Sequence, residues 1–142
     1  MKKFKSKVSY GILIVIFLFF FAPIIIGIIN NGITKNFFVL NEILIPIYAF
    51  ILYLFLSTDY TIDKGKLKIK TGFVYNKYLD IEKIKLITET NNPISAPAAS
   101  FDRIEIHYGE FSSVIISPKD KIGFIKELMK INPNIDSKIL EN

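Results

Sequence analysis

The chain of 142 residues has room for one modest domain, or for a smaller domain with a membrane anchor. Its hydrophobic fraction of 51% and mean hydropathy of +0.38 are too high for an ordinary soluble domain. The net charge of +5 falls mainly on residues 1–56, which hold +4, whereas residues 57–142 hold +1. This division argues against a basic nucleic-acid-binding face on the C-terminal part, so we expect no nucleic-acid partner.

Two apolar runs open the chain. Residues 8–34 contain no charged side chain, and residues 36–58 contain only Glu42. A membrane-spanning helix needs about 20 apolar residues, and the Asn-Asn-Gly segment between the runs is a turn signal. The sequence therefore predicts a transmembrane helical hairpin over residues 1–57, with spans at about 9–29 and 37–57, that contacts membrane lipids. A cleaved signal peptide is the less favoured alternative, because the first run is long and lacks a small-x-small cleavage site.

Lysines indicate the orientation of this hairpin. Four precede the first span and four follow the second, whereas the turn between the spans carries only Lys35. The positive-inside rule then places the N-terminus and the C-terminal domain in the cytoplasm. The absence of cysteine agrees with a reducing compartment. Glu42 lies near the membrane interface, where a headgroup-level acid is the simpler interpretation and an ion or proton relay the alternative.

Residues 58–135 alternate between apolar and polar side chains, which is typical of strands. We expect six of them, at about residues 60–63, 67–70, 73–79, 85–90, 101–108 and 111–117. On the fifth strand, Ile104 and Ile106 should point inward, and Arg103, Glu105 and His107 outward. Ser117 is the expected N-cap of an amphipathic helix that ends at Asn132-Pro133, and residues 136–142 are read as a tail.

Three segments carry a family resemblance: TGFVYNKYLDIEKIK (71–85), NPISAPAASFDRIEIHYG (92–109) and IISPKDKIGFIKELMKINP (115–133). Through them the chain resembles the YyaB-like PH-domain proteins, small bacterial proteins in which two membrane spans precede a PH-like domain. The resemblance implies a protein anchored in the bacterial inner membrane, in which a transmembrane hairpin is followed by a PH-like β-barrel or meander closed by one C-terminal helix. It implies no biochemical role.

The loop before the fifth strand has two interpretations. Asp102, Arg103, Glu105 and His107 could form an acid–base cluster, but alternation places Asp102 on the opposite face from the other three. The favoured interpretation is a structural loop, stiffened by prolines and tied down by polar side chains. Its motif consists of Pro93, Ser95, Pro97, Ser100, Asp102 and Arg103. A partner-docking role for this loop stays open.

A second candidate site is a row of lysines, Lys64, Lys66, Lys68 and Lys70, close behind the second span. It is either an ordinary solvated strand face or a weak contact with anionic lipid at the membrane surface. With one histidine and no phosphate-binding glycine motif, we expect no metal, no cofactor and no enzymatic activity. The expected function is a membrane-anchored PH-like binding or scaffold module with a protein partner. The alternative is an immunity or regulatory membrane protein that blocks a toxin or protease.

Overall fold

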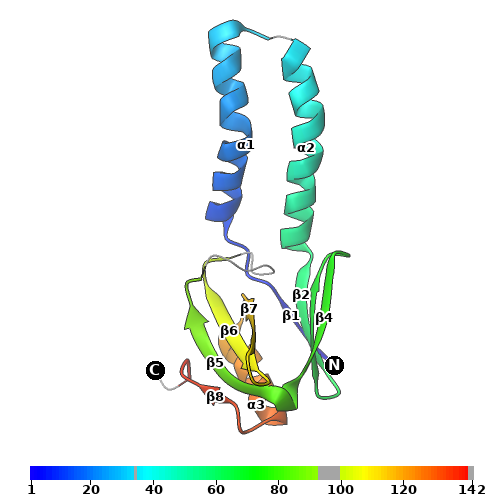
Figure 1. Ribbon diagram of the computed structural model, residues 1–142, viewed down its shortest axis with the longest axis vertical. Coiled ribbons are helices and arrows are strands. Elements are labelled where there is room, and N and C mark those ends of the chain that lie inside the picture. The colour runs from blue at the N-terminus through cyan, green and yellow to red at the C-terminus, as the bar shows by residue number, and fades with distance from the viewer. Residues whose placement is uncertain (34, 93–99, 141–142) are drawn as a thin grey trace. The chain divides into compact units, whose positions relative to one another are not determined.

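The computed structural model describes residues 1–33, 35–92 and 100–140 (Figure 1). The chain forms two compact units. One unit consists of residues 9–54, and the other combines residues 1–8 with residues 55–142. The first eight residues thus belong with the C-terminal domain, although the sequence-based division assigned residues 1–57 to the hairpin.

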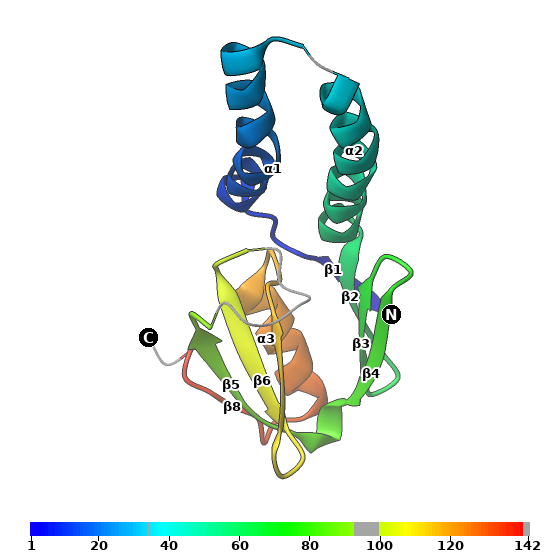
Figure 2. The same cartoon turned by 45° about the horizontal axis from the view of Figure 1, so that its top comes forward.

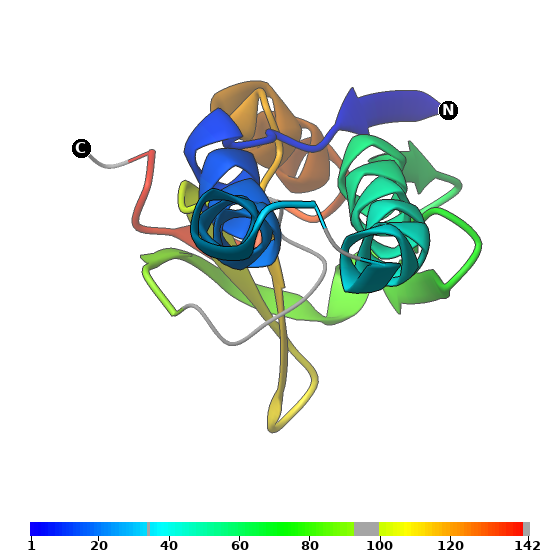
Figure 3. The ribbon, with the colours of Figure 1, turned by 90° about the horizontal axis from the view of Figure 1, so that it is seen from above.

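The first unit is a pair of helices, α1 (Tyr10–Asn31) and α2 (Lys35–Leu56), which Figure 3 views nearly end-on. Both are long and apolar enough to cross a membrane, over residues 10–30 and 38–56. The ring of Tyr48 on α2 contacts Phe17 and Phe21 of α1, with centroids 5.7 and 5.6 Å apart. At the end of α1, Gly32 has a positive φ of 71° and donates its N–H to the carbonyl of Ile28. The expectation of two helices long and apolar enough to cross a membrane is confirmed.

The domain contains a four-stranded antiparallel sheet, here called sheet A, with the order β1-β2-β3-β4. Its strands are β1 (Lys2–Lys5), β2 (Thr58–Asp63), β3 (Lys66–Thr71) and β4 (Tyr75–Asp80). The edge strand β1 was not expected, because a segment of three lysines and one phenylalanine shows no recognisable alternation. It pairs with β2 in a continuous register from Lys2 opposite Ile62 to Lys5 opposite Asp59. The helical hairpin is therefore an insertion between two neighbouring strands.

A second four-stranded sheet, here called sheet B, has the order β7-β6-β5-β8 (Figure 2). Its strands are β5 (Ile84–Thr90), β6 (Arg103–Tyr108), β7 (Ser112–Ile116) and β8 (Asp136–Ser137). The short 3-10 turn η1 (Ile81–Lys83) leads from sheet A into sheet B. Strand β8 runs parallel to β5, so the segment read as a tail begins with a short strand.

Helix α3 (Lys121–Ile131) closes the domain, but its cap differs from the expected one. Asp120 is the N-cap, and its Oδ1 accepts the N–H of Gly123 at 2.9 Å. The expectation that Ser117 caps the helix was wrong. Ser117 is fully buried, and its N–H donates to the hydroxyl of Tyr60 instead.

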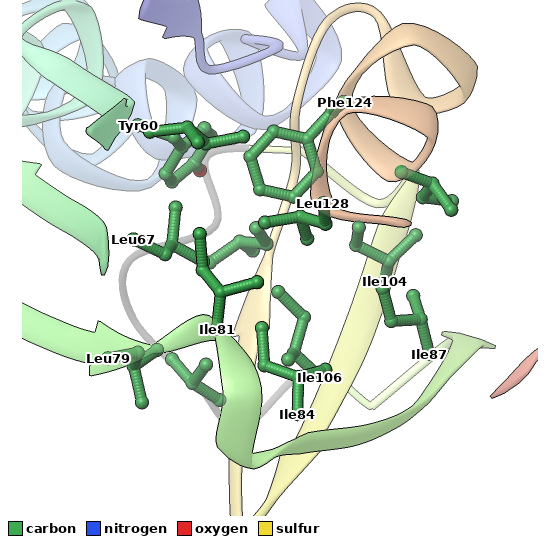
Figure 4. Close-up of a cluster of buried hydrophobic side chains, with 14 of the residues drawn as sticks. Tyr60, Leu67, Leu79, Ile81, Ile84, Ile87, Ile104, Ile106, Phe124 and Leu128 are labelled. Carbon is green, nitrogen blue, oxygen red and sulfur yellow. The ribbon is translucent and has the colours of Figure 1, made fainter. Parts of the chain in front are cut away.

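The hydrophobic core lies between the two sheets and α3 (Figure 4). Phe124 and Leu128 project from α3 toward side chains of both sheets, among them Tyr60, Leu67 and Ile104. All five side chains are fully buried. By contrast, Ile122 on the same helix is 54% exposed. The inward orientation of Ile104 and Ile106 is confirmed.

Candidate functional site

The outer face of sheet A carries the lysine row. In β3, Leu67 and Ile69 point into the core, so alternation turns Lys66, Lys68 and Lys70 outward. Lys64 lies in the β2–β3 turn with a positive φ of 46°, followed by Gly65 at 74°. Such a pair of left-handed residues makes the tight turn that a two-residue hairpin connection needs.

Acidic side chains of the neighbouring strands oppose this row. Lys66 lies between Asp63 on β2 and Asp80 on β4, and Lys70 lies opposite Asp59. Asp59 also pairs with Lys3 on β1, with Nζ and Oδ2 3.0 Å apart. The terminal amino group of Met1 lies 3.4 Å from Oδ1 of Asp63. Cross-strand pairs of opposite charge stabilise a sheet surface, so part of the positive charge is balanced locally.

These side chains line a groove with a volume of about 530 Å³. Its lining consists of Met1, Lys3, Asp59, Thr61, Asp63, Lys64, Lys66, Lys68, Lys70 and Tyr78. The lining includes five lysines and the terminal amino group but only two aspartates. A surface with this imbalance attracts anionic groups, such as carboxylates or phosphates. The contribution of Met1 and Lys3 could not be read from the sequence, because it depends on strand β1.

Lys68 and Tyr78 form the middle of the groove. They are cross-strand neighbours, and the Lys68 ammonium lies 5.2 Å from the centre of the Tyr78 ring. This distance suits a cation–π contact. The hydrogen bond and charge of Lys68 also lower the pKa of the Tyr78 hydroxyl. Tyr78 itself is 59% exposed, so it offers both a ring face and a hydroxyl to a ligand.

The loop motif has a different role from the groove. Of its six residues, Pro93, Ser95 and Pro97 lie outside the described residues. Arg103 is only 7% exposed, so its expected outward, solvated position was wrong. It donates hydrogen bonds from Nε to the carbonyl of Ser100 and from a terminal nitrogen to the carbonyl of Asn92, the latter at 2.7 Å. Arg103 thereby bonds to the described residues on both sides of the loop.

Asp102 joins this loop to two distant parts of the chain. Its carboxylate pairs with Lys7, at 2.6 Å, and with Lys121, which also pairs with Glu89 at 2.8 Å. Partial burial pushes the pKa of Asp102 upward, but the hydrogen bonds and charges of Lys121 and Lys7 outweigh it, and the pKa is lowered. The sequence suggested local turn hydrogen bonds for Asp102. The lysine partners, 95 and 19 residues away, left no local signal.

The fold and these sites can be compared with known proteins. Residues 58–132, just over half of the chain, match the family described as the bacterial PH domain. The chain belongs to this family. No curated protein and no solved structure matches it. The protein therefore consists of two long apolar N-terminal helices followed by a β-sheet PH-like domain capped by a C-terminal helix.

The match to the PH domain begins with β2 and ends just after α3. Strand β1 lies outside it and adds a fourth strand to sheet A of the PH domain. The same strand supplies Lys3 to the groove. The groove is therefore formed partly by the PH domain and partly by the segment that precedes the helices.

The acid–base cluster considered as an alternative combines residues that have different partners in the structure. His107 lies 3.9 Å from Glu105 on the outer face of β6, and Ser113 is its cross-strand neighbour. Arg103 and Asp102 bond to the loop and to lysines instead. Among the described residues, no three His, Cys, Asp or Glu side chains gather as a metal site would require. Of the four residues that an acid–base cluster would have to combine, Glu105 and His107 lie close together, whereas Asp102 and Arg103 are bonded elsewhere.

Proposed function

We propose that this protein is a non-enzymatic binding module, anchored in the bacterial inner membrane, whose PH-like domain holds an anionic partner at the cytoplasmic surface. Within the bacterial PH domain family, we also propose that the protein belongs with the YyaB-like proteins that have two membrane spans. The observation that carries it is the groove on sheet A, in which six positive groups face only two aspartates. The pattern suits an acidic segment of another protein.

The connectivity of the chain supports the anchoring. The chain leaves sheet A after β1, passes through α1 and α2, and re-enters the same sheet at β2. If the two helices span the membrane, the N-terminus and the domain must share one side, because β1 and β2 are hydrogen-bonded to each other. The lysines flanking the spans then favour the cytoplasmic side. This argument for a shared side is independent of the charge rule.

Short connections also favour binding at the membrane surface. Only residues 6–9 lie between β1 and α1, and only Ser57 lies between α2 and β2. A domain held on such short tethers meets membrane-associated partners at a high effective concentration. Weak attraction between the groove and an acidic segment is then sufficient for useful occupancy.

Photo-crosslinking in intact cells tests this proposal. A photoreactive amino acid replaces Thr61, within the groove, or Phe111, which is 98% exposed in the β6–β7 turn and serves as the control. We expect a discrete protein adduct from position 61 only, and its loss when Lys66, Lys68 and Lys70 are changed to Glu. Adducts with lipid alone, or equal adducts from both positions, would contradict a protein-binding groove.

The identity of the adduct also addresses the alternative function. A toxin or a membrane protease recovered from position 61 would favour an immunity or regulatory role. A house-keeping membrane complex would favour a scaffold. Both outcomes use the same groove, so the lysine substitutions should remove either adduct.

A further inference from the structure

Three large apolar side chains are exposed on the domain near the residues that lead into the helices. Phe73, Val74 and Phe101 are 76%, 60% and 66% exposed. The sequence assigned Phe73 and Val74 to a strand, but β4 begins only at Tyr75. Both residues instead lie in the β3–β4 turn, where Gly72 has a positive φ of 53°. A turn projects its side chains away from the sheet, so burial in the core does not explain their apolar character.

The β3–β4 turn is bonded directly to the point where α2 ends. The N–H of Gly72 donates to the carbonyl of Ser57 at 3.2 Å, and Thr71 is the cross-strand partner of Thr58. Ser57 follows Leu56, the last residue of α2, which is 62% exposed. Phe73 therefore follows Gly72, which is hydrogen-bonded to the residue directly after α2.

Phe101 lies close in the fold to the segment that leads into α1. Its neighbour Asp102 pairs with Lys7, three residues before α1 begins at Tyr10. The strand pairing places the β3–β4 turn and Phe101 at the same end of the domain. Ser6 donates its N–H to the carbonyl of Thr58, at the start of β2, and forms a β-bridge with Pro118. Strand β7 ends at Ile116, two residues before Pro118, and this end pairs with the start of β6, next to Phe101.

A still more exposed phenylalanine, Phe111 at 98%, lies at the opposite end of the domain. Phe111 lies in the β6–β7 turn, after the six residues of β6 have led away from Asp102. At about 3.3 Å per residue, this strand separates the two ends by roughly 20 Å. The chain thus offers a matched comparison between exposed aromatic side chains near to and far from the helix connections.

We propose that Phe73, Val74 and Phe101 form a lipid-contact surface that dips into the boundary between headgroups and acyl chains. This inference rests on the proposed membrane anchoring of α1 and α2. Aromatic and aliphatic side chains at this depth gain from removal of apolar area from water. Lys70, at the end of β3 just before the turn, places positive charge beside the same surface, which complements anionic headgroups. A lipid surface is the occupant that both the apolar side chains and their position at the helix ends favour.

Site-specific fluorescence in the full-length chain tests this inference. The chain contains no cysteine, so Val74→Cys or Phe111→Cys provides a single attachment site for an environment-sensitive dye such as NBD. Each labelled protein is reconstituted into phosphatidylcholine vesicles with or without phosphatidylglycerol. Flotation first shows that the chain is inserted. A lipid-borne nitroxide quencher then reports contact with the bilayer.

We expect the label at position 74 to be quenched at least twofold more strongly than the label at position 111, with an effect that persists without anionic lipid. Adding Phe73→Ser should weaken quenching at position 74, whereas Phe111→Ser should leave it unchanged. Equal quenching at both positions in vesicles that float would overturn the lipid-contact surface alone. A label at position 74 could instead be shielded from water but not quenched by the lipid-borne nitroxide, with the shielding increasing at higher protein density. That result would indicate contact with a second copy of the chain and would also overturn the lipid-contact surface. A chain that fails to float would overturn the anchoring and this inference together.

Discussion

The hydroxyl of Tyr60 donates a hydrogen bond of 3.1 Å to Oγ of Ser6, although the helical hairpin separates the two residues in the chain. Tyr60 is buried, which raises the pKa of its hydroxyl despite its hydrogen bonds with Ser6 and Ser117. The hydroxyl also accepts the N–H of Ser117, whose Oγ lies 3.1 Å from Oγ of Ser6. This buried cluster bonds the segment before the helices to the first strand after them and to the β7–α3 junction.

The domain should fold without its helices, and it should be more stable when β1 is retained. Joining residues 1–8 to residues 57–142 through a short Gly/Ser linker should give a soluble, monomeric domain. The fragment 57–142 lacks Phe4, whose ring meets Phe124 at 5.2 Å, and leaves the edge of β2 unpaired. We expect its free energy of unfolding to be lower by about 2–3 kcal/mol, measured by urea denaturation. Phe4→Ser in the joined protein should reproduce much of this loss, and equal stability of the two fragments would contradict the role of β1.

Removing the Tyr60 hydroxyl should be costly. Tyr60→Phe leaves the buried N–H of Ser117 and the hydroxyl of Ser6 without this partner, so we expect a loss of about 1–2 kcal/mol in unfolding free energy. Tyr78→Phe, on the exposed face of sheet A, is the control and should stay within about 0.5 kcal/mol of the unchanged domain. Thermal and urea denaturation of the joined domain measure both. A neutral Tyr60→Phe would mean that the cluster contributes no net stability.

Arg103 should stabilise the domain more than His107 does. Arg103→Ala removes a buried side chain that bonds to the carbonyls of Ser100 and Asn92, so a loss of about 1–3 kcal/mol is expected. His107, with a side chain 40% exposed, should tolerate Ala within about 0.5 kcal/mol. Arg103→Lys should recover little, because a single ammonium cannot reproduce the two-carbonyl geometry. Greater damage from His107→Ala would reverse this assignment.

The ion pairs of Asp102 should make stability depend on pH. Because Lys121 and Lys7 lower its pKa in the folded state, Asp102 stabilises the domain above the unfolded value of about 3.9. That contribution disappears as the pH falls through the lowered folded-state pKa. Asp102→Asn should therefore cost about 1 kcal/mol at pH 7, with the difference from the unchanged domain shrinking below about pH 4. Glu110→Gln, in an exposed turn, is the control; a pH-independent effect of Asp102→Asn would argue against the ion pairs.

If the N-terminus and the domain lie on the same side of the membrane, the topology of the chain can be predicted. A reporter active only in the cytoplasm should be active when fused after residue 142, and one inserted at residue 31 should behave as extracytoplasmic. The lysines on both sides of the hairpin supply the physical reason. Protease accessibility of the domain in right-side-out spheroplasts measures the same arrangement. Cleavage of the domain there would place it outside the cell.

Local patterns were sufficient for most of the fold. Hydrophobic length predicted α1 and α2, because an uncharged apolar run of about 20 residues is long enough to cross a membrane as a helix. Period-two alternation predicted the strands of the PH domain, and Leu67 and Ile69 point inward as it requires. The same alternation placed Lys66, Lys68 and Lys70 together on one face. Each of these features depends on neighbours within a few residues.

The features that the sequence could not predict depend on residues far apart in the chain. Strand β1 has one apolar side chain and becomes a strand only because the edge of β2 accepts its hydrogen bonds. For Arg103 the sequence offered two positions, an outward one on the strand and one bonded to the loop, and its hydrogen bonds to the carbonyls of Asn92 and Ser100 decided for the second. Ser117 fits the sequence pattern of a helix N-cap, but its N–H and hydroxyl bond to Tyr60 and Ser6, and Asp120 caps the helix instead. Short-range preferences of about 1 kcal/mol determined the elements, and buried long-range hydrogen bonds of similar or greater strength decided where these residues lie.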